Sequence, residues 1–432
     1  MMNTIRPKAK TISAMSNHMF NPLRCWWPSA VLAALILSGC ATAPTPKTAE
    51  CSCPAGEKQV QLEKKDEKPA LPLFVKSDFS SLPGWSTANH GRFLEAFAEQ
   101  CSVNGNALAK RKATPTGLLE ACRKARQNLS GNALLPAQIW MEANFEVWQF
   151  QQEDGKKEGL LTGYFEPMLK GSRKAQGAYN APLYGVPADL ITVKLDEQYP
   201  ELKGKRLRGR LQGNTLVPFF DRAEWERLGP DREKPIVWVD DKLDAFLLQV
   251  QGSGRVTLPD GSVIRLSYAE QNGHPYKSIG KVLVDRGELT AAQATIPGIR
   301  NWAKANPGKL DDLLNANPSV VFFKENKVLR PQEGPVGAMG VPLTGQLSLA
   351  IDREKIPYGS PIWIESSNPV TNTPIAQGTL AQDTGGAIRG RVRADYFWGT
   401  GEEAGAAAGL TRQPLKMWLI WPKGTPLPES GS

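Results

Sequence analysis

The spacing of apolar residues along the chain of 432 residues changes from a helical to an alternating pattern near residue 145. Apolar positions in 89–101, in 115–128 and around 136–144 follow a helical period, which predicts three helices. Alternation begins in Phe145-Glu-Val-Trp-Gln-Phe150 and returns in Leu160-Leu-Thr-Gly-Tyr-Phe-Glu166, which predicts two strands. A helical segment is therefore expected to precede a mainly stranded one.

Beyond residue 167 the pattern predicts mostly short strands broken by Gly and Pro, as far as about residue 290. Within it, 255–266 predicts a hairpin that turns at Pro259-Asp-Gly-Ser262. Helical segments return near 278–286, 290–304 and 309–316, and strands dominate again from Pro318 to Trp421. We therefore expect a mainly β fold with flanking α-helices, arranged as two β-barrel-like units.

The first 39 residues have the pattern of an export signal. They carry four basic residues and no acidic one, and an apolar run over 30–37 leads to Ser38-Gly39-Cys40. Even counted from Trp26 the apolar stretch is about 12 residues, whereas a bilayer span needs about 20. Translation could start instead at Met15 or Met19.

The junction Leu37-Ser-Gly-Cys40 resembles a lipobox, so we expect cleavage before Cys40 and lipid on its thiol. Ala41 rather than Asp follows, which by resemblance to lipoprotein sorting rules favours the outer membrane, with the folded part in the periplasm. An uncleaved anchor, or ordinary cleavage with a free Cys, is the alternative. Residues 40–75, rich in Pro, Lys, Glu, Thr and Ala, predict a flexible tether.

Charge and cysteines limit the function classes. Four of the nine net positive charges lie in the signal, and the remaining +5 on 393 residues indicates an anionic polymer or lipid headgroup rather than nucleic acid. With three histidines in the chain we expect no metal site and no cofactor. Cys51-Ser-Cys53 is too closely spaced for the usual zinc pattern. Cys101 and Cys122 could form a disulfide in an oxidising compartment, and the sequence leaves that pairing open.

Three aspartates near the carboxyl end stand out as candidates for chemistry: Asp352, Asp383 and Asp395. Asp383 precedes Gly385-Gly386, which could bring the backbone close to a ligand, although a tight turn explains the same residues. Asp395 opens an aromatic strand, where partial desolvation would raise its pKa and suit it to general-acid work. Pairing with Arg393 or Arg391 on the surface is the structural alternative for Asp395.

The spacing of these aspartates resembles the three-aspartate (3D) domain of the membrane-bound lytic murein transglycosylase A family. The resemblance covers roughly residues 80–425. It includes the segments 159–167, 248–254, 272–281 and 317–323 besides the 3D region.

The resemblance implies a double-psi β-barrel built from two pieces of the chain. The domains it implies are residues 76–165, with helices and the first part of the barrel, an inserted β domain over 166–324, the second part of the barrel over 325–425, and a tail over 426–432. A substrate groove is expected where the two domains meet.

The resemblance also implies cleavage of the β-1,4 bond between N-acetylmuramic acid and N-acetylglucosamine in peptidoglycan, with formation of a 1,6-anhydro end. Asp395 is then the single catalytic acid and base, and Asp383, Gly385 and Gly386 support it or bind substrate. Thr162, Tyr164, Gln251 and Ser253 are expected to line the groove. Cell-wall synthesis enzymes are further candidate partners.

Two other functions stay open at this point. One is an inverting glycoside hydrolase on the same fold, with Asp395 as acid and Asp383 as base. The other is a peptidoglycan-binding lipoprotein without catalytic activity. The chemistry of the released ends separates the first from transglycosylation, and an Asp395→Asn variant separates the second.

Overall fold

The computed structural model describes residues 71–101, 114–131, 135–202, 205, 207–326 and 333–428. All of them belong to one compact unit of the chain. The export signal, Cys40 and the tether as far as residue 70 lie outside these residues. Among the residues that are described, no helix is long and apolar enough to cross a membrane.

The three predicted N-terminal helices are confirmed: α1 (His90–Glu99), α2 (Thr116–Ser130) and α3 (Ala137–Asn144). A disulfide between Cys101 and Cys122 joins the end of the α1 region to α2, which answers the question the sequence left open. Strand β1 (Phe74–Ser77) pairs with β2 (Phe145–Phe150). Regular structure therefore begins before residue 75, the expected end of the tether.

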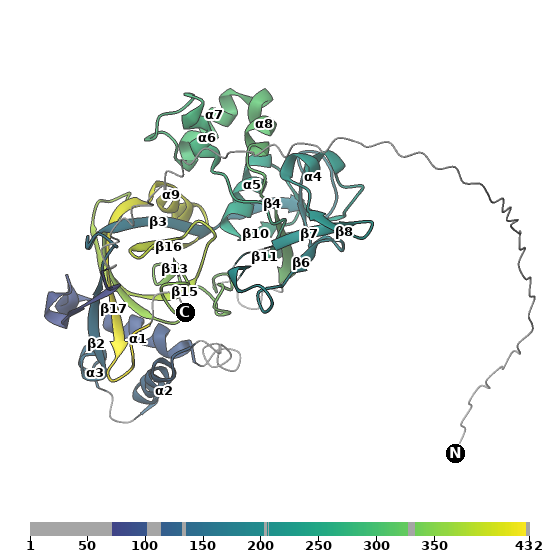
Figure 1. Cartoon of the computed structure of the whole chain (residues 1–432). Helices are drawn as coiled ribbons and strands as arrows, with labels where there is room; N and C mark the ends of the chain where they lie inside the picture. The colour runs from purple at the N-terminus through teal and green to yellow at the C-terminus, as the bar shows by residue number, and fades with distance from the viewer. Residues whose placement is uncertain are drawn as a thin grey trace, which may run out of the picture. The chain divides into compact units, whose positions relative to one another are not determined.

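Eight strands form the larger sheet, in the order β1-β2-β17-β14-β15-β13-β16-β3. An additional pairing of β17 with β3 closes a ring of six hydrogen-bonded strands. Strands from the two ends of the folded chain thus lie side by side, as the blue β3 and the yellow-green β16 show (Figure 1). The strands not yet bounded are β3 (Gly159–Glu166), β13 (Ser348–Ile351), β14 (Pro361–Ser367), β15 (Pro374–Asp383), β16 (Arg393–Thr400) and β17 (Arg412–Pro422).

Large aromatic side chains fill the core of this region. Trp363, Trp421 and Tyr396 from the ring and Phe93 and Phe97 from α1 are all almost completely buried. Helix α1 packs very closely on β15, because a Cβ at Gly378 would lie 2.4 Å from the ring of Phe93. This close contact fixes α1 against the sheet that carries the candidate acids.

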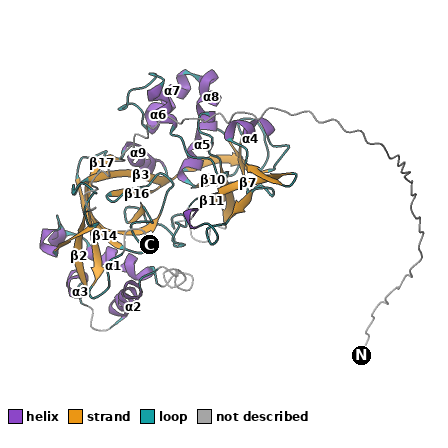
Figure 2. Cartoon of the chain, in the orientation of Figure 1, coloured by secondary structure: helices purple, strands orange, loops and turns teal. Residues whose placement is uncertain are grey.

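A second region, between β3 and β13 in the chain, contains a six-stranded sheet in the order β12-β11-β10-β4-β9-β5 and a three-stranded sheet β6-β7-β8 (Figure 2). The predicted hairpin is confirmed as β10 and β11. The strands are β4 (Met168–Ser172), β5 (Ala181–Tyr184), β6 (Ile191–Val193), β7 (Leu207–Gln212), β8 (Thr215–Pro218), β9 (Pro235–Val239), β10 (Ser253–Thr257), β11 (Val263–Gln271) and β12 (Val321–Asn326).

The helices expected near 278–286, 290–304 and 309–316 are present as α6 (Ile279–Asp285), α7 (Ile296–Ala305) and α8 (Leu310–Asn315). Three other helices were not expected: α4 (Arg222–Leu228), α5 (Lys242–Gln251) and α9 (Glu402–Leu410). They lie in stretches for which the sequence pattern predicted mostly strands.

Helix α5 begins and ends at typical capping residues. Asp241 caps its start, and the Asp241 side chain accepts a hydrogen bond from the Asp244 amide. Gly252 ends the helix in the left-handed region, with φ of 78°.

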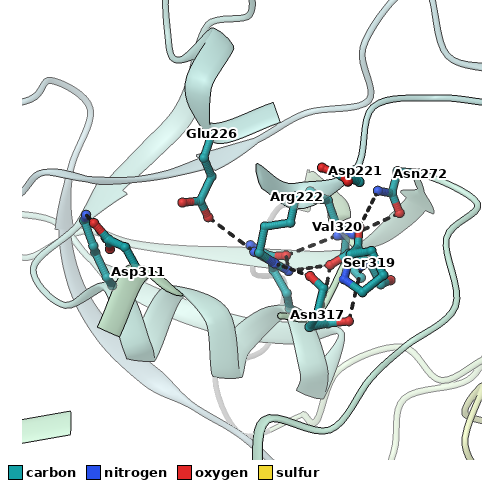
Figure 3. A network of polar contacts seen from close by, with 12 residues as sticks. Asp221, Arg222, Glu226, Asn272, Asp311, Asn317, Ser319 and Val320 are labelled. Atoms are coloured by element: carbon teal, nitrogen blue, oxygen red, sulfur yellow. Dashed lines mark hydrogen bonds and ion pairs between the residues drawn. The ribbon is translucent and has the colours of Figure 1, made fainter. Parts of the chain in front are cut away.

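A buried polar network holds separate segments of the second region together (Figure 3). Arg222 donates from Nε to the Asn317 carbonyl (3.1 Å) and from Nη2 to Gln249 Oε1 (2.8 Å) and the Ser319 carbonyl. Its guanidinium lies over the ring of Phe246, and burial lowers the pKa of Arg222 to about 10. These carbonyl oxygens, together with an ion pair to Glu226 at 3.6 Å, stabilise the buried charge.

Asn272 makes a similar link in the same network. Its Nδ2 donates to the carbonyls of Phe220 and Pro318, and its Oδ1 accepts from the Val320 amide (Figure 3). The segments beginning at 272 and 317, which carried part of the family resemblance, therefore have a structural role here.

Candidate active site

Strands β3 and β16 run parallel as neighbours, and their register places Asp395 opposite Thr162 and Phe397 opposite Tyr164. Ala394 and Tyr396, the residues on either side of Asp395 in β16, belong to the aromatic core. Since side chains alternate along a strand, these four opposed residues lie on the other face of the ring. The pairing thus brings two predicted groove residues, Thr162 and Tyr164, to the predicted acid.

Asp395 is half-buried, and the hydroxyl of Thr162 donates a hydrogen bond of 2.6 Å to its Oδ1. Arg393, two residues earlier on the same face, donates from Nη2 to the Thr162 oxygen at 2.8 Å. Burial raises the pKa of Asp395 to about 6, and the nearby Asp383 acts in the same direction. The Thr162 hydrogen bond and the Arg393 charge oppose that rise.

Asp383 ends β15, and both its carboxylate oxygens accept hydrogen bonds. Oδ1 accepts from the Ala338 amide at 2.8 Å, and Oδ2 accepts from the Tyr164 hydroxyl at 3.1 Å. Burial raises the pKa of Asp383, and it also raises the pKa of Tyr164 well above its ordinary value. The ring of Tyr164 packs on Phe397, with centroids 5.1 Å apart. Asp383 is thus held at both oxygens, unlike Asp395.

The two glycines after Asp383 do not use the backbone freedom expected of them, because neither has a positive φ. A Cβ at Gly386 would meet no atom within 4 Å, and one at Gly385 would come within 3.0 Å of Ile388. The turn at Gly386 therefore borders open space.

Asp352, the third aspartate, has a structural position. It is 3% exposed and accepts hydrogen bonds from the amides of Gly390 (2.9 Å) and Glu354 (3.2 Å). It also pairs with Arg389 at 3.2 Å. Gly390 has φ of 120°, a conformation that favours glycine. Asp352 thus fixes the loop that leads into β16.

The remaining predicted groove residues lie in the second region. Gln251 is the last residue of α5, and its Oε1 accepts a hydrogen bond of 3.1 Å from the Phe165 amide of β3. Ser253 begins β10 and lies opposite Ser267 of β11. The structure therefore ties Gln251 to the strand of Thr162 and Tyr164, and it places Ser253 in the adjoining hairpin.

Glu166, at the end of β3, is a completely buried carboxylate that the sequence interpretation did not single out. Arg255 donates to it at 2.8 Å, Thr400 donates at 2.9 Å, and Arg265 pairs with it at 2.9 Å. We call these four residues the Glu166 clamp. Arg255 and Arg265 also both donate to the Glu333 carbonyl. The clamp thus joins β3 and β16 to the β10–β11 hairpin.

A signal for the clamp was present in the sequence. Arg255 and Arg265 lie on the two strands of the predicted hairpin, and in the structure they lie directly opposite each other. Like charges at such positions destabilise a hairpin unless a carboxylate lies between them. A glutamate at the end of a neighbouring strand is the natural partner.

A cavity of about 710 Å³ lies next to Phe397, on the side of the clamp. Its lining comes from both regions of the chain, and neither candidate acid is part of it. The lining includes Gln100, Met168, Arg255, Leu343, Phe397 and Thr400.

Comparison with known proteins gives two matches to family models. One, described as the MltA specific insert domain, matches residues 160–324, and the other, described as the 3D domain, matches residues 347–421. These descriptions define a class of protein in which an MltA-type insert precedes a 3D domain, as the two regions of this chain do.

Curated relatives and solved structures make the assignment specific. Membrane-bound lytic murein transglycosylase A of Escherichia coli (strain K12) is 32% identical over 284 residues, 64% of this chain and 69% of that protein. The crystal structure of MltA from Neisseria gonorrhoeae has 32% identity and a TM-score of 0.69, covering 83% of this chain and 94% of the other. E. coli MltA with bound chitohexaose has 26% identity and a TM-score of 0.60, with 83% and 96% covered.

The chain belongs to the membrane-bound lytic murein transglycosylase A family, and it is therefore an enzyme. This confirms the family predicted from the sequence. The mainly β architecture with flanking helices also agrees with the similar structures.

Proposed function

We propose that this enzyme cleaves the β-1,4 bond between N-acetylmuramic acid and N-acetylglucosamine in peptidoglycan and closes a 1,6-anhydro ring, with Asp395 as the single acid and base. Relatives named as lytic murein transglycosylases support the substrate and the reaction class. The similar structure of E. coli MltA with chitohexaose supports a glycan ligand.

The observation that carries the single-acid mechanism is the state of Asp395. Burial raises its pKa to about 6, so a useful fraction is protonated near neutral pH, and the hydrogen bond from Thr162 occupies only Oδ1. The protonated carboxyl gives its proton to the glycosidic oxygen as the bond to the anomeric carbon breaks. The resulting carboxylate then takes the proton of the C6 hydroxyl as that oxygen attacks the same carbon.

The surroundings of Asp383 argue against a two-carboxylate hydrolase. Such an enzyme needs a second carboxylate that is free to activate water. Both oxygens of Asp383 already accept hydrogen bonds, from Ala338 and from Tyr164. In our proposal Asp383 keeps Tyr164 and the loop of Ala338 in place. The substrate's own C6 hydroxyl attacks the anomeric carbon in place of water, because the effective concentration of this hydroxyl is far higher than that of water.

The test is mass spectrometry of the muropeptides released from purified sacculi. We expect products one water lighter than the corresponding reducing ends, and reducing ends alone would show a hydrolase instead. Asp395→Asn should lower the rate by about 10³-fold or more, because it removes the transferable proton. The matched control is Asp285→Asn, at an exposed ion pair with Lys281, which should leave the rate unchanged.

A binding protein without activity would give a different pattern. It would release no muropeptides, and Asp395→Asn would have no effect on its interaction with sacculi.

We further propose a detailed domain architecture and a cellular location for the enzyme. These are a double-psi β-barrel made from 76–165 and 325–425, an insert over 166–324, and an enzyme anchored by lipid on Cys40 to the outer membrane, facing the periplasm. The closed ring of strands supports the barrel, and the phrase "membrane-bound" in the names of the relatives supports the anchor. Cys40→Ala should move the protein from the membrane fraction to the soluble fraction, and an unchanged distribution would refute the lipid anchor.

A further inference from the structure

Arg393, Thr162 and Asp395 form a linear chain of hydrogen bonds on the outer face of β3 and β16. The distances are 2.8 Å from Arg393 Nη2 to Thr162 Oγ1 and 2.6 Å from that oxygen to Asp395 Oδ1. We propose that Arg393 is a positioning residue which, through the Thr162 hydroxyl, keeps Oδ1 of Asp395 an acceptor and leaves Oδ2 to give and take the proton. The inference rests on the proposed role of Asp395.

The direction of each hydrogen bond in this chain is set by what each group can donate. A guanidinium has only donors, so the Thr162 oxygen must accept from Arg393. The single hydroxyl proton of Thr162 is then directed to its other close partner, Oδ1. A proton placed on Oδ1 would compete with it, and the Thr162 proton would lose its acceptor. The distance of 2.6 Å is typical of a hydroxyl that donates to a carboxylate.

Arg393 is itself fixed by further contacts. Its Nη1 donates to the backbone carbonyls of Ala394 and, at 3.5 Å, Leu160. It therefore bridges the two strands at the position where they bring Thr162 and Asp395 together. A side chain held in this way needs no reorganisation when the proton leaves Asp395.

The catalytic consequence concerns which oxygen reacts. In the first step the Oδ2–H bond breaks, the proton moves to the glycosidic oxygen, and the carbon–oxygen bond of the leaving sugar breaks. In the second step Oδ2 takes the C6 hydroxyl proton as the new carbon–oxygen bond forms. Both transfers use the same atom, so the carboxyl does not have to rotate between them. A fixed proton position thus suits an enzyme with one acid.

The other charged and titratable groups near Asp395 act from different elements. Asp383 on β15 raises its pKa, and Asp383 and Asp395 both raise that of Tyr164 on β3. Arg412 on β17 lies in register with Thr162 but is exposed. On α9, which packs against both strands, the acidic residues are the exposed Glu402 and Glu403.

The decisive variant is Thr162→Val, which keeps the shape of the side chain and removes the hydroxyl. Its kcat on soluble peptidoglycan glycan strands should fall by about 10–100-fold, whereas KM should stay within about twofold. The decline of kcat/KM on the alkaline side should shift to higher pH, because a hydrogen bond that lowers the pKa of Asp395 is lost. Thr162→Ser retains the hydroxyl and should restore the wild-type profile.

A sugar-binding role for Thr162, as the sequence suggested, predicts the opposite split. KM would rise and the alkaline decline would stay in place, and this result would overturn the inference. Thr215→Val, at an exposed position on β8, is the matched control for a threonine-to-valine change on a strand.

Arg393→Met should produce the same defect as Thr162→Val, since Arg393 acts through Thr162. The double variant should then be within about threefold of the worse single variant. If the loss in kcat of the double variant equals the product of the two single losses, Arg393 and Thr162 act independently, and the inference is refuted. If Arg393→Met does not fold, Arg393→Lys serves instead, because it keeps the charge and loses the forked geometry.

Failure of this inference can be separated from failure of the proposed function. If Asp395→Asn is inactive and products carry anhydro ends, but Thr162→Val has normal kcat and pH profile, only the role of Arg393 is wrong. If Asp395→Asn retains full activity, the single-acid mechanism fails first.

Discussion

The Glu166 clamp and the Asp395 site both contain a carboxyl group on the same pair of parallel strands, but their surroundings differ. Glu166 is completely buried between two arginines and also accepts a hydrogen bond from Thr400. Asp395 is only half-buried, and Thr162 donates to one of its oxygens.

The difference shows how one strand pair can serve two purposes. A carboxylate bound by two guanidinium groups fixes the hairpin of the second region against β3. A carboxyl with one hydrogen bond and partial desolvation has a raised pKa and can exchange its proton. The number of charged partners, more than burial alone, separates the structural acid from the proposed catalytic one.

The largest expected effect comes from breaking the Glu166 clamp. Glu166→Gln should lower the free energy of unfolding by about 3–5 kcal/mol, because Arg255 and Arg265 lose the charge that compensates them. Urea denaturation followed by tryptophan fluorescence measures this effect. The matched control is Glu325→Gln, at an exposed pair with Arg173, which should cost less than about 1 kcal/mol. Equal losses in the two variants would contradict a special role for the clamp.

The second largest effect is expected for the kinetics of an Asp383 variant. Asp383→Asn should lower kcat by about 10–100-fold without abolishing activity, because Asp383 positions Tyr164 and the loop of Ala338. The decline of kcat/KM on the alkaline side should also shift to lower pH, since the charge of Asp383 raises the pKa of Asp395 in the wild type. This direction is opposite to the one expected for Thr162→Val. Wild-type kinetics and an unmoved alkaline decline would exclude any role of Asp383.

The smallest effect is a gain of stability in Asp395→Asn. The pKa of Asp395 is raised from 3.8 to about 6, so the folded state binds more protons than the unfolded state between these values. Stability of the wild type should therefore fall as pH rises through this window. Because the side chain is partly exposed, we expect the variant to be only about 1 kcal/mol more stable above pH 6.

Thermal melts at pH 4 and pH 7 test this expectation. The variant and the wild type should melt together at pH 4 and separate at pH 7. A variant less stable at pH 7 would mean that Asp395 contributes to the fold as Glu166 does.

Sequence pattern predicted much of the fold, including α1, α2, α3 and the β10–β11 hairpin. Helix α9 was missed because Gly405 and Gly409 lower helix propensity, while close packing of Gly405 against Phe165 favours the helix in the folded chain. For α5 the signal was present: Asp241 is a helix-capping residue type, and Leu243, Phe246 and Leu247 have helical spacing.

The candidate site could be predicted only in part. Motif resemblance identified Asp395, Asp383, Thr162 and Tyr164. The structure places Asp395, Thr162 and Tyr164 on the neighbouring strands β16 and β3, and Asp383 of β15 accepts a hydrogen bond from Tyr164. Arg393 could not be assigned, because its role depends on the register between strands that are more than 200 residues apart in the chain. Local periodicity contains no information on such a register.

The ring of strands determines how much of the chain must be made before the enzyme can become active. Thr162 and Asp395 are separated by 233 positions, and β17, which pairs with β3, follows later still. A chain whose synthesis stops before β16 lacks the proposed acid, and one whose synthesis stops before β17 lacks the strand that closes the ring. Peptidoglycan cleavage is therefore postponed until nearly all of the folded part has been synthesised.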